Sequence, residues 1–505
     1  MKKLMFIFLL TIGLFLVGCS ESMEYSTTML AYNIAIEAES NEEYADISEN
    51  KFISVSDMPV STFSADVDTA AYSIIRKKLM QDELPNRNAV RIEEMLNYFT
   101  YDLDTPIGNE VIHVTKELSD APWNEDHQLL MLGLKTEDII YENAIPSNLV
   151  FLLDVSGSMN SADKLPLLKQ AIILLVGELR ASDRISLVVY AGSAGVVLDG
   201  ADGSDKESII DAINSLEAGG STAGGEGINL AYNVAATNYI EGGNNRVILA
   251  TDGDFNVGVS SDAALERLIT QKKESGIFLS VCGFGTGNLK DSKMETLADK
   301  GNGVYYYIDN LLEAKKVFVE EMGGTLLTVA KDVKLQVEFN PALVKGYRLI
   351  GYENRILDYN DFNNDEVDAG DIGAGHEVIV LYEIIPFGSD EVIDEATYEI
   401  PETLKYDGEN YLDQMLTLSI RYKAPDSDVS EKKDYVVYDS DFTETPSDNF
   451  LFASSVAEFG MLLLDSEFKY NSSYNAVIAR ATDVYNDDYK EEFIELVRIA
   501  QRLQD

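Results

Sequence analysis

The sequence predicts an α/β protein with a central, doubly wound and mainly parallel sheet. Between residues 149 and 319, short apolar runs alternate with helical patterns, which is typical of a parallel sheet covered on both faces. The run from Val247 to Ala250 is apolar throughout, as expected of a strand buried on both sides. Another run ends abruptly in Asp154 and two hydroxyl residues, where this kind of sheet places its ligands. We expect an α+β region before this central domain and a β-rich domain, ending in helices, after it.

The amino terminus has the layout of an export signal over residues 1–18. Two lysines precede an apolar run that ends in Leu16-Val17-Gly18-Cys19. This ending resembles the lipobox of bacterial lipoproteins, which implies cleavage before Cys19, lipid attachment to its thiol and N-acylation with a fatty acid such as palmitate. The alternatives are an ordinary signal peptide or a short membrane anchor, but the run is too short to span a bilayer comfortably.

The segment after the signal peptide is expected to connect the lipid anchor to the folded part of the protein. Residues 19–58 are polar and show no clear period, which indicates a flexible tether between the lipid and the folded body. Ser20 stands where an Asp would resemble an inner-membrane retention signal, so the sequence favours an outer-membrane location in the bacterial cell envelope. Cys282 lies in a strand-like run, and we expect a buried structural thiol and no disulfide.

An N-terminal flanking domain is expected over residues 59–145. Its patterns predict a strand, two helices and two antiparallel strands, at 61–69, 70–80, 91–99, 111–118 and 129–134. Asp66 and Asp68 stand beside the start of the first helix. They are either a pair of metal ligands or part of a helix cap, and the cap is the favoured interpretation.

The central domain is expected over residues 146–325. Its predicted strands lie at 149–153, 184–190, 246–251, 277–284 and 303–308. The helices between and after them are predicted at 165–179, 206–215, 225–236, 262–273, 291–299 and 311–321. Ligands of such a sheet bind in the loops at the carboxyl ends of its strands, so these loops belong to one candidate site.

A C-terminal β-rich domain with terminal helices is expected over residues 326–505. Alternating apolar and polar residues predict antiparallel strands at 333–339, 347–352, 377–383, 414–422 and 435–438. The chain then returns to helical periodicity at 449–464 and 474–503. Phe493, Leu496, Val497 and Ala500 lie on one face of the last helix.

The charge of the chain limits its partners. A formal net charge of −48 over 505 residues opposes binding to nucleic acids and to anionic lipid surfaces, because both would repel the protein. The same charge attracts cations. A solvated acidic surface gives the same composition, so the charge alone does not identify a partner.

Three loops of the central domain carry oxygen ligands for a metal ion. The first contains Asp154, Ser156 and Ser158, the second is a glycine-rich segment around Thr222, and the third begins with Thr251-Asp252-Gly253. Mg²⁺ prefers about six oxygen ligands and usually keeps some water, so one or two carboxylates with a few hydroxyls suffice and leave a position open. The loops therefore predict a site for Mg²⁺, with Mn²⁺ or Ca²⁺ as alternatives.

This pattern resembles the metal-ion-dependent adhesion site (MIDAS) of von Willebrand factor type A (VWA) domains. Asp-x-Ser-x-Ser, a loop-two Thr and Thr-Asp-Gly match the motif, which implies metal contact, directly or through water, at Asp154, Ser156, Ser158, Thr222 and Asp252. The resemblance also implies that an acidic side chain of a protein partner completes the coordination. Segments 63–70, 90–99, 347–355 and 452–460 resemble the flanking regions of a bacterial lipoprotein family with a central VWA domain.

Three function classes follow from these features. The first is a lipid-anchored, metal-dependent protein-binding module without catalytic residues. The second is a structural or assembly scaffold that acts through its flanking domains, with the metal only stabilising loops. The third is an Mg²⁺-dependent aspartyl phosphotransferase, which would need a second carboxylate two residues after Asp154. Ser156 stands there and cannot act as a general acid near neutral pH, so we do not expect an enzyme.

Overall fold

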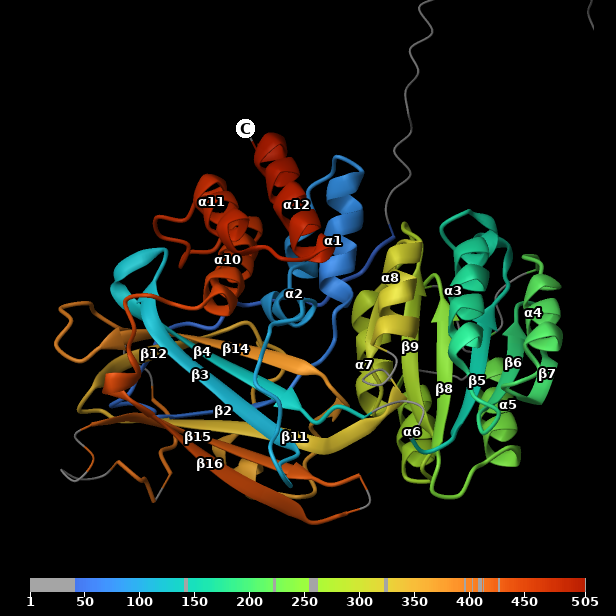
Figure 1. The fold of residues 1–505 in the computed structure, drawn as a ribbon, viewed down its shortest axis with the longest axis horizontal. Coiled ribbons are helices and arrows are strands. Elements are labelled where there is room, and N and C mark those ends of the chain that lie inside the picture. Colours follow the sequence, from blue (N-terminus) through green and yellow to red (C-terminus); the bar gives the residue numbers. More distant parts are fainter. Residues whose placement is uncertain are drawn as a thin grey trace, which may run out of the picture. The chain divides into compact units, whose positions relative to one another are not determined.

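The computed structural model describes residues 41–139, 144–220, 224–253, 262–321, 326–394, 397–401, 403–406, 411, 413–425 and 427–504 (Figure 1). Residues 40–505 form one compact unit. The expected signal peptide, Cys19 and residues 19–40 of the expected tether lie outside the described residues. Residues 41–58, the rest of the expected tether, lie against the folded body, where Ile53 pairs with Tyr347 and Ser54 pairs with Gly346 in a sheet. Among the helices that the structure describes, none is long and apolar enough to cross a membrane.

The central domain is built on a six-stranded sheet in the order β10-β9-β8-β5-β6-β7. All neighbouring strands are parallel except β6 and β7. The strands are β5 (Ser147–Asp154), β6 (Arg184–Tyr190), β7 (Ala194–Asp202), β8 (Asn244–Thr251), β9 (Phe278–Phe284) and β10 (Tyr305–Ile308). The mainly parallel sheet is confirmed, and the antiparallel edge strand β7 is an addition to the prediction.

Helices cover both faces of this sheet because successive residues of β5 point to opposite sides. Leu149, Phe151 and Leu153 pack in one apolar core with α3 (Leu165–Glu178) and α4 (Lys206–Asn214). Val150 and Leu152 pack in a second core with helices from the opposite face, namely α5 (Gly224–Thr237), α6 (Asp262–Lys273) and α7 (Asp291–Lys300). The domain is therefore doubly wound (Figure 1).

The order of the strands creates a switch point at β5. The chain passes from β5 to β6 on one side, and β8 then pairs with β5 on the other side. Loops from two directions consequently meet beyond the carboxyl ends of β5 and β8, which is where open α/β sheets bind ligands. Asp154 is the last residue of β5, and Asp252 directly follows β8.

The flanking segments on either side of the central domain share two antiparallel sheets. One has the order β1-β12-β14-β4-β3, and the other has the order β13-β11-β15-β16 with β2 paired to β11. The strands before the central domain are β1 (Ile53–Ser54), β2 (Val60–Ser64), β3 (Ile112–Ala121) and β4 (Asn124–Thr136). Those after it are β11 (Thr328–Phe339), β12 (Val344–Ile350), β13 (Gly370–Gly373), β14 (Glu377–Pro386), β15 (Gln414–Lys423) and β16 (Ser430–Tyr438).

Alternation along β4 and β14 creates a separate core on each side of their sheet. Leu130, Leu132, Val378 and Val380 face strands of the second sheet, whereas the residues between them face helices. The helices are α1 (Ala70–Met80), α2 (Ile92–Asn97), α10 (Asp448–Leu463), α11 (Tyr474–Val484) and α12 (Asp488–Gln504). In Figure 1, blue α1 and α2 lie beside red α10 and α12, so both ends of the described chain build this layer.

Several elements differ in extent from the expectation. The helix predicted at 311–321 is α8 (Leu311–Lys315) followed by a π-helical turn (Lys316–Glu320). The region 474–503 is divided into α11 and α12 by a short break after Val484. The strand expected at 61–69 ends at Ser64, since the acidic residues beyond it make polar contacts instead of ladder pairs. Cys282 lies buried in β9, as expected.

Candidate metal centre

The first loop is organised around the carboxylate of Asp154, which is fully buried at the end of β5. Its Oδ1 accepts a hydrogen bond from the backbone N–H of Ser156 (2.8 Å). The hydroxyls of Ser156 and Ser158 lie 2.9 Å apart, with Ser156 buried and Ser158 exposed. The loop therefore presents a carboxylate and two neighbouring hydroxyls, the first buried and the second open to solvent.

Two further hydroxyls hold the second oxygen of Asp154. Tyr190, the last residue of β6, donates to Oδ2 at 3.1 Å, and Thr251, the last residue of β8, lies at 3.5 Å from the same oxygen. Burial, and to a lesser extent the neighbouring carboxylate of Asp252, raise the pKa of Asp154 above its usual value. A cation beside Asp154 would relieve this unfavourable environment of the charged form.

The third loop supplies Asp252, which is 1% exposed. The ammonium of Lys164 donates to its Oδ2 at 2.8 Å. Its Oδ1 is buried and has no hydrogen-bond partner among the described residues. A buried carboxylate oxygen without a partner is costly, and a metal ion or a water bound to one would satisfy it.

The second loop comes close to the first through its backbone. The N–H of Gly157 donates to the carbonyl of Gly220 (3.2 Å), and the N–H of Gly219 donates to the carbonyl of Val155 (2.8 Å). Gly220 has a φ of +85°, which favours glycine at this turn. Thr222 itself lies outside the described residues, so its predicted role stays a prediction.

The third loop is also supported from outside the central sheet. Gly253 has a φ of +106°, and a Cβ there would lie 2.7 Å from Leu289 Cα, so only glycine fits. The segment against which Gly253 packs is held in turn by the first described residues of the chain. The N–H of Asn41 donates to Gly287 and that of Glu43 donates to Leu289, both at 2.9 Å.

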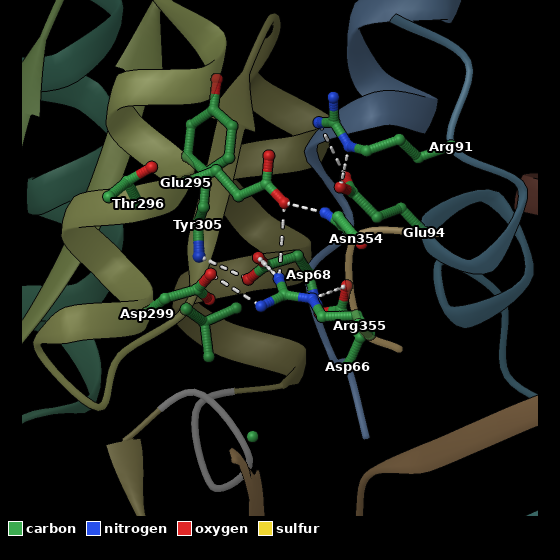
Figure 2. Close-up of polar contacts among 12 residues, drawn as sticks. Asp66, Asp68, Arg91, Glu94, Glu295, Thr296, Asp299, Tyr305, Asn354 and Arg355 are labelled. Atoms are coloured by element: carbon green, nitrogen blue, oxygen red, sulfur yellow. Dashed lines mark hydrogen bonds and ion pairs between the residues drawn. The ribbon is translucent and has the colours of Figure 1, made fainter. Parts of the chain in front are cut away.

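A second group of buried carboxylates lies where the central domain meets the flanking segments (Figure 2). Asp66, Asp68 and Glu94 have carboxylate oxygens within 4.8 Å of one another. Asp68 accepts from the backbone N–H of Tyr305 (2.7 Å), and Glu94 accepts from that of Ala71 (2.7 Å), at the start of α1. We name these three carboxylates the junction cluster.

Two arginines close the junction cluster, as Figure 2 shows. Arg355 contacts Asp66 at 3.1 Å and Asp68 at 3.2 Å, and Arg91 forms an ion pair with Glu94. Both guanidinium groups also bind carboxylates of α7: Arg355 lies 2.6 Å from Asp299, and Arg91 lies 2.6 Å from Asp291. The carboxylates already have cationic partners, and they join the central domain to its flanks.

Asp66 and Asp68 do not form the predicted cap of α1, whereas their alternative role as metal ligands stays a prediction. Asp68 accepts from a strand N–H of the central sheet, and Asp66 accepts from the N–H of Asp68 (2.9 Å). Thr69, the residue before α1, forms no side-chain cap, and Glu94 receives the N–H of Ala71 in that helix. The cap thus comes from a distant residue, which the local sequence does not reveal.

The fold and the loops define the class of the central domain, and comparison with family models agrees. A model described as the von Willebrand factor type A domain matches residues 148–320. A model described as von Willebrand factor matches residues 38–131, and one described as the C-terminal region of the uncharacterized protein YfbK matches residues 324–503. This is a protein with a VWA domain between two flanking segments.

The particular family follows from a relative that matches most of the chain. The protein named YfbK of Escherichia coli (strain K12) is 42% identical over 472 residues, which cover 92% of this chain and 81% of that protein. The chain therefore belongs to the family of bacterial VWA proteins that includes YfbK. A protein of Synechocystis sp. is 28% identical over 266 residues, or 52% of this chain and 62% of its own length.

Other similarities cover a smaller share of the chain or have a lower sequence identity. Inter-alpha-trypsin inhibitor heavy chain H4 of Sus scrofa is 28% identical over 199 residues, or 37% of this chain and 21% of that protein. Among solved structures, the hypothetical protein BatB from Bacteroides thetaiotaomicron is 26% identical with a TM-score of 0.31, over 35% of this chain and 97% of that chain. A von Willebrand factor type A protein from Catenulispora acidiphila is 15% identical with a TM-score of 0.42, over 77% of this chain and 89% of that chain.

The described residues of the candidate site fit a divalent cation. They offer two buried carboxylates, two hydroxyls and one carboxylate oxygen without a hydrogen-bond partner, which are the hard ligands that Mg²⁺ and Mn²⁺ prefer. Sequence reasoning missed Lys164 and Tyr190 in this site. Lys164 directly precedes α3, where a positive charge interacts unfavourably with the helix dipole. This unfavourable position was the sequence feature that could have indicated a special role for Lys164.

Proposed function

We propose that this protein binds a protein partner through a divalent ion held by Asp154, Ser156, Ser158, Thr222 and Asp252. A VWA domain supports a protein-interaction or adhesion role. The observation that carries the metal-dependent form is the pair of buried carboxylates at neighbouring strand ends, one of which has an oxygen without a hydrogen-bond partner among the described residues. When bound, the ion would supply an open coordination position for an acidic side chain of the partner.

The residues around the site would hold this arrangement in place. Tyr190 and the backbone N–H of Ser156 fix the orientation of Asp154, so its carboxylate need not reorganise when an ion arrives. Ser158 is exposed and lies at the rim where a partner would approach. Ser156 occupies the position where a phosphotransferase needs an acid, and therefore we propose binding without turnover.

Capture of the partner with and without chelator tests this function. Proteins crosslinked to the wild type in intact cells should include at least one species that disappears with EDTA and with Asp154→Ala. Asp211→Ala is the matched control, because it removes an exposed carboxylate of α4 in the same domain. Captured proteins that are unchanged by chelator and by Asp154→Ala would favour the scaffold function of the flanking segments.

We also propose that the protein is anchored by lipid on Cys19, with an outer-membrane location. The support is the lipobox-like sequence Leu16-Val17-Gly18-Cys19 with Ser20 after it. Cys19→Ser should move the protein from the membrane fraction to the soluble fraction of the envelope and remove the lipid mass from the mature amino terminus. Unchanged membrane association of this variant would contradict the lipid anchor.

A further inference from the structure

Lys164 places a fixed positive charge inside the candidate metal centre. Its Nζ lies 2.8 Å from Asp252 Oδ2, and the side chains are 10% and 0% exposed, respectively. The two oxygens of the Asp252 carboxylate therefore differ. Oδ2 accepts a hydrogen bond from the ammonium, whereas Oδ1 has no hydrogen-bond partner among the described residues. The lysine thus neutralises one side of a carboxylate and leaves the other available.

The path of the lysine side chain is built into the fold. Lys164 directly precedes α3, and its methylene groups run over Gly285, which follows β9. A Cβ at Gly285 would lie 2.6 Å from Lys164 Cγ and closer still to Cε, so a larger residue there would collide with the lysine. Gly285 also has a φ of +72°, which suits glycine. The lysine is therefore held in one place by packing.

The positive charge of Lys164 opposes the binding of a divalent ion at this site. Asp154 and Asp252 supply two buried negative charges, and Lys164 supplies one positive charge against them. A divalent ion held by Asp252 Oδ1 would share this carboxylate with the ammonium of Lys164. Like charges that share one carboxylate repel strongly in the interior, where water screens them little.

We propose that Lys164 is an internal counter-cation of the ion site, which orients Asp252 in the ion-free protein and lowers the affinity for a divalent ion. This inference rests on the proposed function, because it concerns the same ion. It assigns Lys164 as a positioning residue that sets the strength of ion binding. The ion pair with Lys164 would spare the buried carboxylate of Asp252 from being left without a cation when no ion is bound.

Calorimetric titration of the full chain with MnCl₂ tests the assignment. Lys164→Met keeps an unbranched side chain over Gly285 and removes the charge, and it should bind Mn²⁺ about tenfold more tightly than the wild type or better. Lys273→Met is the matched control, since it removes the same charge from an ion pair with the exposed Asp368. Its affinity for Mn²⁺ should equal that of the wild type.

The outcomes separate this inference from the proposed function. If the wild type binds Mn²⁺ and Lys164→Met binds it equally or more weakly, the inference is wrong and the ion site stands. If neither binds Mn²⁺, the ion site is wrong and the inference falls with it. Binding by Lys164→Met alone would support the inference, because the lysine would then be the group that keeps the ion out.

Thermal unfolding provides a second readout. In EDTA, Lys164→Met should unfold at a lower temperature than the wild type, because Asp252 is left buried without its partner. Addition of MnCl₂ should raise the unfolding temperature more in this variant than in the wild type. A variant that fails to fold both with and without Mn²⁺ would overturn the inference, since Lys164 would then act as a structural support alone.

Discussion

Two groups of buried carboxylates in this protein are neutralised in different ways. In the junction cluster, Asp66, Asp68 and Glu94 contact Arg355 or Arg91, and both arginines also reach carboxylates of α7. In the candidate metal centre, Asp154 is held by hydroxyls and a backbone N–H, and Lys164 pairs with one oxygen of Asp252. The junction cluster is neutralised by arginines, whereas the candidate metal centre retains one carboxylate oxygen without a hydrogen-bond partner among the described residues.

This contrast shows how buried acids can serve either structure or binding. Planar guanidinium groups contact several carboxylates at once and join elements far apart in the sequence, which suits a domain junction. A single ammonium with a partly satisfied aspartate leaves a place for another cation. Three carboxylates lie close together in the junction cluster, but they already have arginine partners. Proximity of carboxylates alone therefore does not make the junction cluster a better ion site than the candidate metal centre.

Replacement of Arg355 at the junction cluster should cause the largest loss of stability among the changes considered. Arg355→Met leaves Asp66 and Asp68 buried without their cation, which should reduce the free energy of unfolding by about 3–5 kcal/mol. Arg421→Met is the control, because its ion pair with Asp365 is more exposed and should contribute less than about 1 kcal/mol. Chemical denaturation measures both. Equal losses of unfolding free energy in the two variants would show that the junction cluster stabilises the protein no more than a more exposed ion pair.

Stabilisation by metal should distinguish the two groups of acids. Mg²⁺ at about 100 times its dissociation constant should stabilise the wild type by about 2.7 kcal/mol. Asp252→Asn should abolish this gain, whereas Asp66→Asn should retain it, because only Asp252 belongs to the proposed ion site. Thermal unfolding with and without MgCl₂ checks the prediction. Loss of the gain in Asp66→Asn instead would place the ion in the junction cluster.

The surroundings of the junction cluster should make stability depend on pH. Burial raises the pKa of Glu295, which contacts Arg355 and Asn354, to about 8 from its ordinary value of 4.5. Between these values the folded state binds more protons than the unfolded state, so this group lowers stability as pH rises from about 4.5 to 8.

Glu295→Gln removes this titrating group and keeps a side chain of similar shape. The variant should lose less stability than the wild type between about pH 5 and about pH 8. The difference near the upper end of this range should exceed about 1 kcal/mol, because a single pKa unit is worth about 1.4 kcal/mol and the pKa of Glu295 rises by more than one unit. Urea unfolding at several pH values provides the measurement. Parallel pH profiles of the wild type and the variant would show that Glu295 is not the group that binds the extra proton in the folded state.

The smallest effect is expected at the rim of the metal centre. Ser158 is exposed, and its hydroxyl lies 2.9 Å from that of Ser156. Ser158→Ala should weaken Mn²⁺ binding by about 0.5–1.5 kcal/mol and leave the ion-free unfolding temperature nearly unchanged. Titration calorimetry and thermal unfolding measure the two quantities. Unchanged ion affinity in this variant would exclude a role for the Ser158 hydroxyl.

The alternation of strands and helices in the central domain was predictable because each element has a local pattern. The strand at Arg184–Tyr190 and the helices at Ala70–Met80 and Asp262–Lys273 have the predicted ends. The edge strand β7 was missed because its half-exposed residues lack a continuous apolar run. The predicted domain boundaries remain predictions, although strands from both flanks pair in the same sheets.

The contacts of the candidate site were less predictable than its motif. Asp154, Ser156 and Ser158 are neighbours in the sequence, so their shared loop follows from the motif. The pairing of Lys164 with Asp252 spans 88 residues and depends on how the fold brings the residue before α3 beside the residue after β8. The junction cluster likewise depends on long-range pairs, such as Arg355 with Asp66, that no local period encodes.

Direct measurement of ion binding tests whether the candidate metal centre holds a divalent ion. Titration calorimetry of the ion-free protein with MgCl₂ and MnCl₂ should show one ion bound per chain in the wild type and in the control Asp211→Ala. Asp154→Ala should show no binding at the same concentrations. Absence of binding in the wild type, or equal binding in Asp154→Ala, would contradict an ion site at Asp154.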